Sequence, residues 1–295
     1  MKTLETPHDC LLNSERPKSL LFHLDKSAAV LESCVNYGTH IFSSLMEKGV
    51  DEYFETIPPL FYRHILEMTD ATQVLLHQGV ADPTDVLLRS AFEAFLGLEF
   101  ITTKNTELRC KSYIVADTVS ELKIYRSDDY RDIVGSDSIL DSEIKSKQAG
   151  LESPRYHSVY KEYLRTKKAN KNRPPNWYSL FDGPKNLSSL SKELDRYDWY
   201  SALYSSFSQV SHASNILRKI WSDPNTGHLE IRGLRSVQKL NTNIELTIGF
   251  IVEASLLILE NYFPDQSPNF KQWYLKEIHE FRQSLLNAPK YDFRW

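Results

Sequence analysis

The stretch that decides the fold is DPTDVLLRSAFEAFLGLEFITT, which runs from Asp82 to Thr103. Its apolar residues recur every three or four positions, which is the spacing of one buried face of an α-helix. Asp82 is a suitable N-cap and Pro83 suits the first helical position, so we predict a helix from Pro83 to Thr103. Arg89 and Glu93 are four residues apart, so they share a face of this core helix and we expect them to be partly buried.

Similar helical patterns occur along most of the chain. They cover residues 19–48, 58–78, 106–125, 138–149, 154–168, 237–262 and 270–287. The chain has 10 glycines in 295 residues, which favours long helices over a turn-rich β fold. Only residues 226–234 have the pattern of an extended segment. We therefore predict an all-α fold, a helical bundle with an N-terminal helical arm and a C-terminal helix packed back on it.

The helical patterns also divide the chain into three segments. Residues 1–50 form an N-terminal arm and helix, residues 51–262 a helical core domain, and residues 263–295 a C-terminal helix. We expect a homo-oligomer that forms through the long terminal helices. The net charge of −4 excludes a surface that attracts nucleic acid as a whole, so contact with RNA or DNA would need a local basic patch.

Cysteine usage and hydropathy predict a cytoplasmic protein. The three cysteines are widely separated, which indicates free thiols in a reducing compartment. The N-terminus lacks the apolar core of a signal peptide. The most apolar run, from Ile248 to Leu259, is interrupted by Glu253 and is shorter than the roughly 20 residues that span a membrane. We predict no membrane association.

A polar stripe lies on a second predicted helix, within YSSFSQVSHASN. Tyr204, Ser208 and His212 follow one another at intervals of four, and Ser211 and Asn215 flank them. A partly buried arginine needs several hydrogen-bond acceptors to offset its desolvation, and this stripe is the best supply of them. We expect the two helices to face one another, so that their polar groups meet in one pocket.

Four stretches together carry a resemblance to a known family: LLRSAFEAFLGLEFI, RCKSYIVAD, NWYSLF and YDWYSALYSSFSQVSHASN. They resemble the family catalogued as Domain of Unknown Function 5677, and the likeness extends from about Leu60 to Leu259. The family pattern is Arg-x-x-x-Glu, then tryptophan, then Tyr-x-x-x-Ser-x-x-x-His. In this chain the pattern falls on Arg89, Glu93, Trp177, Tyr204, Ser208 and His212. The resemblance implies an α-helical intracellular domain of microbial origin, without an established activity.

A more distant likeness is to the HEPN helical domains, many of which cut RNA without a metal. Their hallmark is an arginine followed within four to six residues by a histidine on one helix. It is missing here: Arg16 and His23 have six residues between them, but Pro17 disrupts the helical context, and Arg218 follows His212 instead of preceding it. A HEPN-like activity would therefore need Arg89 and His212 to meet through the fold.

This likeness yields two hypotheses on function. The first is a metal-independent HEPN-like effector that acts on RNA or a nucleotide, as a toxin or phage-defence component. In it Arg89 binds phosphate, His212 performs acid–base catalysis, Glu93 orients the histidine, and Tyr204, Ser208, Ser211, Asn215 and Trp177 contact the ligand. The second is a non-catalytic helical module that binds a partner protein or a small anionic ligand in the same pocket.

Each candidate residue also has a purely structural interpretation. His212 can be a core histidine hydrogen-bonded to Ser208, the Arg89–Glu93 pair a buried clamp between helices, and Trp177 a plug at the end of the bundle. The basic run 161–173 can be a solvated loop or a segment that binds a phosphate backbone. We predict neither a metal site nor a cofactor, since the sequence shows no cluster of metal ligands and no glycine-rich phosphate loop.

Overall fold

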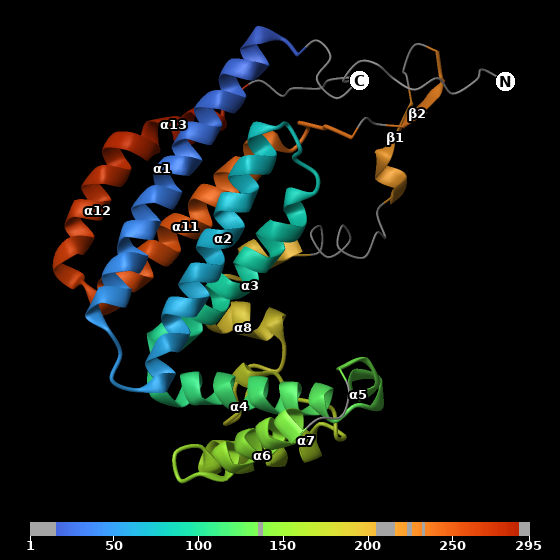
Figure 1. Ribbon diagram of the computed structural model, residues 1–295. Helices are drawn as coiled ribbons and strands as arrows, with labels where there is room; N and C mark the ends of the chain where they lie inside the picture. The colour runs from blue at the N-terminus through green and yellow to red at the C-terminus, as the bar shows by residue number, and fades with distance from the viewer. Residues whose placement is uncertain (1–15, 135–137, 205–215, 223–225, 232–233, 289–295) are drawn as a thin grey trace. The chain divides into compact units, whose positions relative to one another are not determined.

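The computed structural model describes residues 16–134, 138–204, 216–222, 226–231 and 234–288 (Figure 1). The chain forms two compact units. Unit 1 comprises Met1–Lys48, Phe61–Phe95 and Trp199–Trp295, and unit 2 comprises Gly49–Leu60 and Leu96–Asp198. These units divide the chain along lines other than the predicted segments 1–50, 51–262 and 263–295.

Unit 1 is built from long helices (Figure 1). It contains α1 (Lys18–Lys48), α2 (Ile57–His77) from Phe61 onward, α3 (Thr84–Thr103) as far as Phe95, α11 (Leu240–Tyr262), α12 (Ser267–Trp273) and α13 (His279–Leu285). A π-helical turn, Tyr274–Ile278, separates α12 from α13. It interrupts the single helix expected over residues 270–287. α1 packs along α11, and α12 and α13 also pack against α11, which confirms the predicted bundle and the C-terminal helix folded back on it.

α11 is the core helix of unit 1. Its isoleucines 244, 248, 251 and 258 are fully buried, and the ring of Phe250 packs against Phe92 and Phe95 of α3 with centroids 5.7 and 6.4 Å apart. α11 is also the one described helix long and apolar enough to cross a membrane by length and composition. However, 67% of its most apolar window is buried inside the protein, as in a core helix.

Gly38 sets the approach of α1 to α2. A Cβ at this position would lie 2.4 Å from Leu66 Cδ2 and 3.0 Å from the hydroxyl of Tyr62, so any larger residue would displace these side chains. That same hydroxyl bonds Ser255 Oγ of α11 at 2.8 Å. Three helices of unit 1 therefore meet at one glycine.

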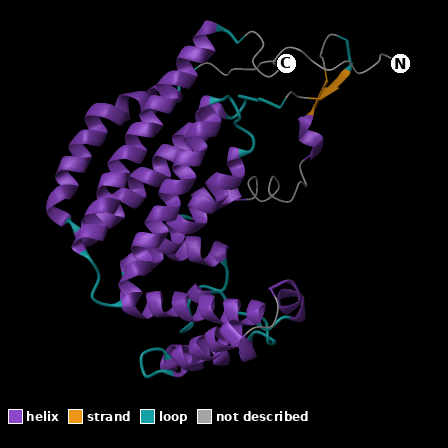
Figure 2. Ribbon diagram, viewed as in Figure 1, coloured by secondary structure: helices purple, strands orange, loops and turns teal. Residues whose placement is uncertain are grey.

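A short β ribbon precedes α11 (Figure 2). β1 (Ile220–Ser222) pairs antiparallel with β2 (Leu229–Ile231), with Ile220 opposite Ile231. β2 lies in the segment predicted to be extended, whereas its partner β1 was not predicted. The ribbon is a small addition to an all-α fold.

Unit 2 contains shorter helices around a core of its own. They are α4 (Thr106–Tyr125), α5 (Asp128–Val134), α6 (Ser138–Glu152), α7 (His157–Ala169), α8 (Leu187–Glu193) and α9 (Tyr197–Trp199), whose last residue belongs to unit 1. Two 3₁₀ turns, Tyr53–Thr56 and Trp177–Ser179, also belong to unit 2. The core joins α4, α6 and α7 through Val115, Leu122, Leu140, Ile144, Leu151, Val159 and Tyr163.

Candidate functional site

The Arg89–Glu93 pair predicted from the sequence forms on α3. Arg89 Nε donates to Glu93 Oε1 at 2.9 Å, and 22% of the arginine side chain and 41% of the glutamate side chain are exposed. Leu88 and Phe92, their neighbours on the helix, are almost fully buried. The guanidinium is thus fixed by its own helix at the margin of an apolar core, as the sequence predicted.

The other predicted site residues are distributed differently. Ser208, Ser211, His212 and Asn215 lie outside the described residues, and Tyr204 ends a π-helical turn, Tyr200–Tyr204. Trp177 belongs to unit 2. Its ring packs edge-on against Phe100 and Tyr113, with centroids 5.7 and 5.6 Å away. Among the described candidates, Arg89 and Glu93 are therefore the two that the structure brings together.

The described flanks of the polar stripe contact α3 and the residues just before it. On the N-terminal side, the Trp199 ring stacks on Phe95, with centroids 5.9 Å apart, and also packs against Phe250. On the C-terminal side, Lys219 pairs with Asp82 just before α3 begins. The described residues that flank the stripe are thus fixed at Phe95 and at Asp82, which lie on either side of Arg89 in the sequence.

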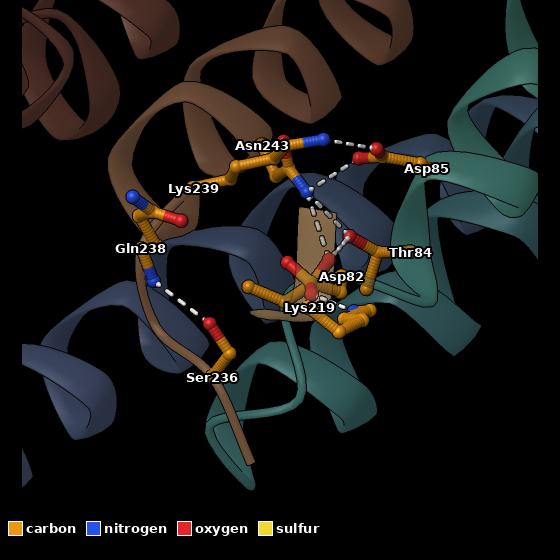
Figure 3. Close-up of polar contacts among 9 residues, drawn as sticks. Asp82, Thr84, Asp85, Lys219, Ser236, Gln238, Lys239 and Asn243 are labelled. Carbon is orange, nitrogen blue, oxygen red and sulfur yellow. Dashed lines mark hydrogen bonds and ion pairs between the residues drawn. The ribbon is translucent and has the colours of Figure 1, made fainter. Parts of the chain in front are cut away.

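A buried polar cluster joins the N-terminal ends of α3 and α11 (Figure 3). Asp85, whose side chain is fully buried, accepts from Lys239 Nζ at 2.5 Å and from Asn243 Nδ2 at 3.2 Å. Asn243 Nδ2 also donates to Thr84 Oγ1 at 2.7 Å and to the carbonyl oxygen of Ala81 at 3.0 Å. The cluster fixes the helix that carries Arg89.

Sequence reasoning did not identify this cluster, although one signal was present. Asp85 precedes Arg89 by four residues and therefore lies on the same face of α3. Its presence among apolar residues required a buried partner. Its partner Lys239 carried no such signal, because the helix was predicted to begin at residue 237, whereas α11 begins at Leu240.

A histidine of α2 also contacts α3 near the candidate pair. His64 Nε2 lies 2.7 Å from the hydroxyl of Ser90, the residue that follows Arg89. Across the described ranges, no group of three or more histidine, cysteine or acidic residues is placed to hold a metal ion. The two described cysteines, Cys34 and Cys110, are buried, and burial raises the pKa of each thiol to about 12. Neither is suited to nucleophilic chemistry.

Comparison with known proteins identifies the family. No curated protein and no solved structure matches the chain. The model of a family of unknown function, DUF5677, matches residues 56–228, which is more than half of the chain and includes Arg89, Glu93 and Trp177. The resemblance predicted from those residues is thereby confirmed, and the protein belongs to the DUF5677 family.

Proposed function

We propose that this protein is a cytoplasmic, metal-independent effector that acts on RNA or a nucleotide. Arg89 binds the phosphate, His212 performs the acid–base step, and Glu93 orients the histidine. Tyr204, Ser208, Ser211 and Asn215 contact the ligand beside His212. The observation that carries the proposal is that the two described flanks of the His212 segment contact Phe95 and Asp82, on either side of Arg89 in the sequence.

The two contacts fix the described residues on either side of the segment that contains His212. Asp82 and Phe95 are 13 residues apart, which corresponds to about 20 Å along a helix with a rise of about 1.5 Å per residue. Arg89 lies halfway between them. The 19 residues from Tyr200 to Arg218 connect these two points, and His212 is among them. An extended chain spans about 3.3 Å per residue, so a connection of this length is long enough for His212 to reach the guanidinium, as the proposal requires.

The residue types fit cleavage of a phosphodiester without a metal. Neutral His212 would accept the proton of the ribose 2′-hydroxyl while its oxygen attacks the phosphorus. The bond from phosphorus to the 5′-oxygen would break, and the histidine would return its proton to that oxygen. Arg89 would bind the phosphate oxygens as charge develops on them. The products would be a 2′,3′-cyclic phosphate and a 5′-hydroxyl.

The test uses purified protein and a short single-stranded RNA, with EDTA present. We expect the wild type to release 2′,3′-cyclic phosphate ends, and Arg89→Ala and His212→Ala each to lower the rate by at least 100-fold. Arg63→Ala is a matched control, because Arg63 and Glu67 form an ion pair of the same spacing on the exposed face of α2. Induction of the wild type should also slow cell growth, whereas the two site variants should not.

The alternative is a non-catalytic module that binds a partner protein or a small anion at the same place. It is favoured by the Arg89–Glu93 bond, since a carboxylate at 2.9 Å already compensates the arginine. Calorimetry with the same RNA separates the two hypotheses. RNA that binds through Arg89 but is not cleaved would contradict the enzyme hypothesis and support the binding module. RNA that is neither bound nor cut would exclude RNA as the ligand.

A further inference from the structure

Unit 2 contains a cavity of about 410 Å³ that is separate from the Arg89 site. It lies between the C-terminal end of α3, the first turns of α4 and the loop 177–183. Cavities that bind small molecules in proteins span about 300–1,000 Å³, combine apolar walls with a few polar groups, and are few per protein. This one is suited to a compact ligand.

A buried arginine forms one wall of the cavity. Arg109 is 9% exposed, and its guanidinium carbon lies 3.4 Å from the centroid of the Phe100 ring. In the described part of the chain it forms one hydrogen bond, from Nη1 to the carbonyl oxygen of Phe100, and one ion pair, to Glu193 at 3.5 Å. A guanidinium has five N–H donors. Arg109 therefore retains donors for an anion in the cavity.

The surroundings of Arg109 favour a single small anion. Lys104 lies 3.5 Å from the same oxygen of Glu193, so two cations share one carboxylate. Arg109 and Lys104 also lie beside the N-terminal end of α4, where the helix dipole favours negative charge. Two carboxylates, Asp182 and Glu193, line the cavity as well. They disfavour a polyanion and can accept hydrogen bonds from amino groups of a ligand.

An aromatic ring is held at the rim of the cavity at a cost in backbone strain. Phe181 is 43% exposed and has a φ of 56°, and Asp182 has a φ of 58°. Positive φ is unfavourable for a bulky residue and marks sites where the surroundings impose the geometry. Glu162 imposes it here, because its carboxylate accepts from the Phe181 N–H at 2.9 Å and also binds Arg165, which pairs with Asp182.

We propose that this cavity binds a nucleoside monophosphate, with the phosphate on Arg109 and Lys104 and the base against the ring of Phe181. The pattern of one buried cation, one exposed ring and nearby carboxylates matches a phosphate, a planar base and its amino group. The proposal does not depend on RNA cleavage at Arg89. It assigns unit 2 a ligand of its own.

The test is isothermal titration calorimetry on the full chain, with AMP, adenosine, inorganic phosphate and benzoate as probes. We expect AMP to bind in the micromolar to low millimolar range, and adenosine and phosphate to bind at least tenfold more weakly. Lys104→Ala should weaken the binding of AMP and of phosphate by similar factors. Lys145→Ala, which removes an exposed lysine elsewhere in unit 2, should leave binding unchanged.

Phe181→Gly is the decisive variant, because glycine adopts a positive φ without strain. We expect its melting temperature to match or exceed that of the wild type, whereas AMP binding weakens at least tenfold and phosphate binding does not change. No heat with 10 mM AMP would overturn the proposal, as would AMP binding that is unaffected by both Lys104→Ala and Phe181→Gly. Benzoate that binds as tightly as AMP would overturn the nucleotide assignment.

Discussion

Replacing Lys239 by methionine should destabilise unit 1 and thereby test the buried cluster of Figure 3. The substitution keeps most of the apolar stem and removes the cation that lies 2.5 Å from the fully buried carboxylate of Asp85. Removing one partner of a buried ion pair costs about 3–5 kcal/mol of stability, because the remaining charge is left uncompensated. Lys239 is 36% exposed and Asn243 still donates to Asp85, so we expect a smaller loss of about 2–3 kcal/mol in the free energy of unfolding.

The double variant Asp85→Asn/Lys239→Met separates an uncompensated charge from simple loss of packing. Asp85→Asn alone should cost about 1 kcal/mol, since Lys239 can turn towards solvent. In the double variant no buried charge is left without a partner, so it should be at least about 1 kcal/mol more stable than Lys239→Met. The singles are therefore non-additive if the reasoning is correct.

Urea unfolding followed by circular dichroism measures these differences. The melting temperature of Lys239→Met should be roughly 5–10 °C below that of the wild type. The control is Lys271→Met, which removes one partner of an exposed pair with Glu260 and should change stability by less than about 0.5 kcal/mol. A Lys239→Met protein as stable as this control, or a double variant whose loss equals the sum of the single losses, would refute the reasoning.

Three further predictions concern other parts of the chain. Hydrogen bonds from Arg165 lower the pKa of Glu162 to about 2, so this carboxylate stabilises the fold above its unfolded pKa of about 4.3 and loses that contribution as the pH falls towards 2. Between pH 5 and 2, the free energy of unfolding of Glu162→Gln should therefore fall by about 1–2 kcal/mol less than that of the wild type. Gly183→Ala should lower the melting temperature by several degrees, because its Cβ would lie 2.1 Å from the carbonyl oxygen of Tyr178. Cys34 should not react with a thiol reagent at pH 8 until the protein is unfolded, and mass spectrometry of the labelled peptides would show this.

The helices were the part of the fold that the sequence predicted best. α3, expected from Pro83 to Thr103, spans Thr84–Thr103, and α4 spans the predicted residues 106–125. Both have an apolar face with helical spacing, and α3 also has a proline at its start, so local and tertiary preferences agree. β1 was missed because three residues, Ile220–Ser222, provide no periodicity and form a strand only through pairing with β2.

Within the candidate site, only the contact between two residues of one helix was predicted and then observed. Arg89 and Glu93 meet because they are four residues apart on α3. The partners of Asp85, in contrast, come from residues 239 and 243, more than 150 positions away. Spacing along the chain indicates that such a buried carboxylate needs partners, but the choice among distant residues depends on how the helices pack.

The limits of the family match and the limits of the hydrophobic core do not coincide. The match ends at residue 228, whereas Phe92 and Phe95 pack against Phe250 of α11. A fragment cut at residues 56 and 228 would therefore lack the α11 ring that packs against both, which would expose apolar surface and favour aggregation. Soluble expression of the Arg89 site requires the helices on both sides of the matched region, so family boundaries are a poor guide to where this chain can be shortened.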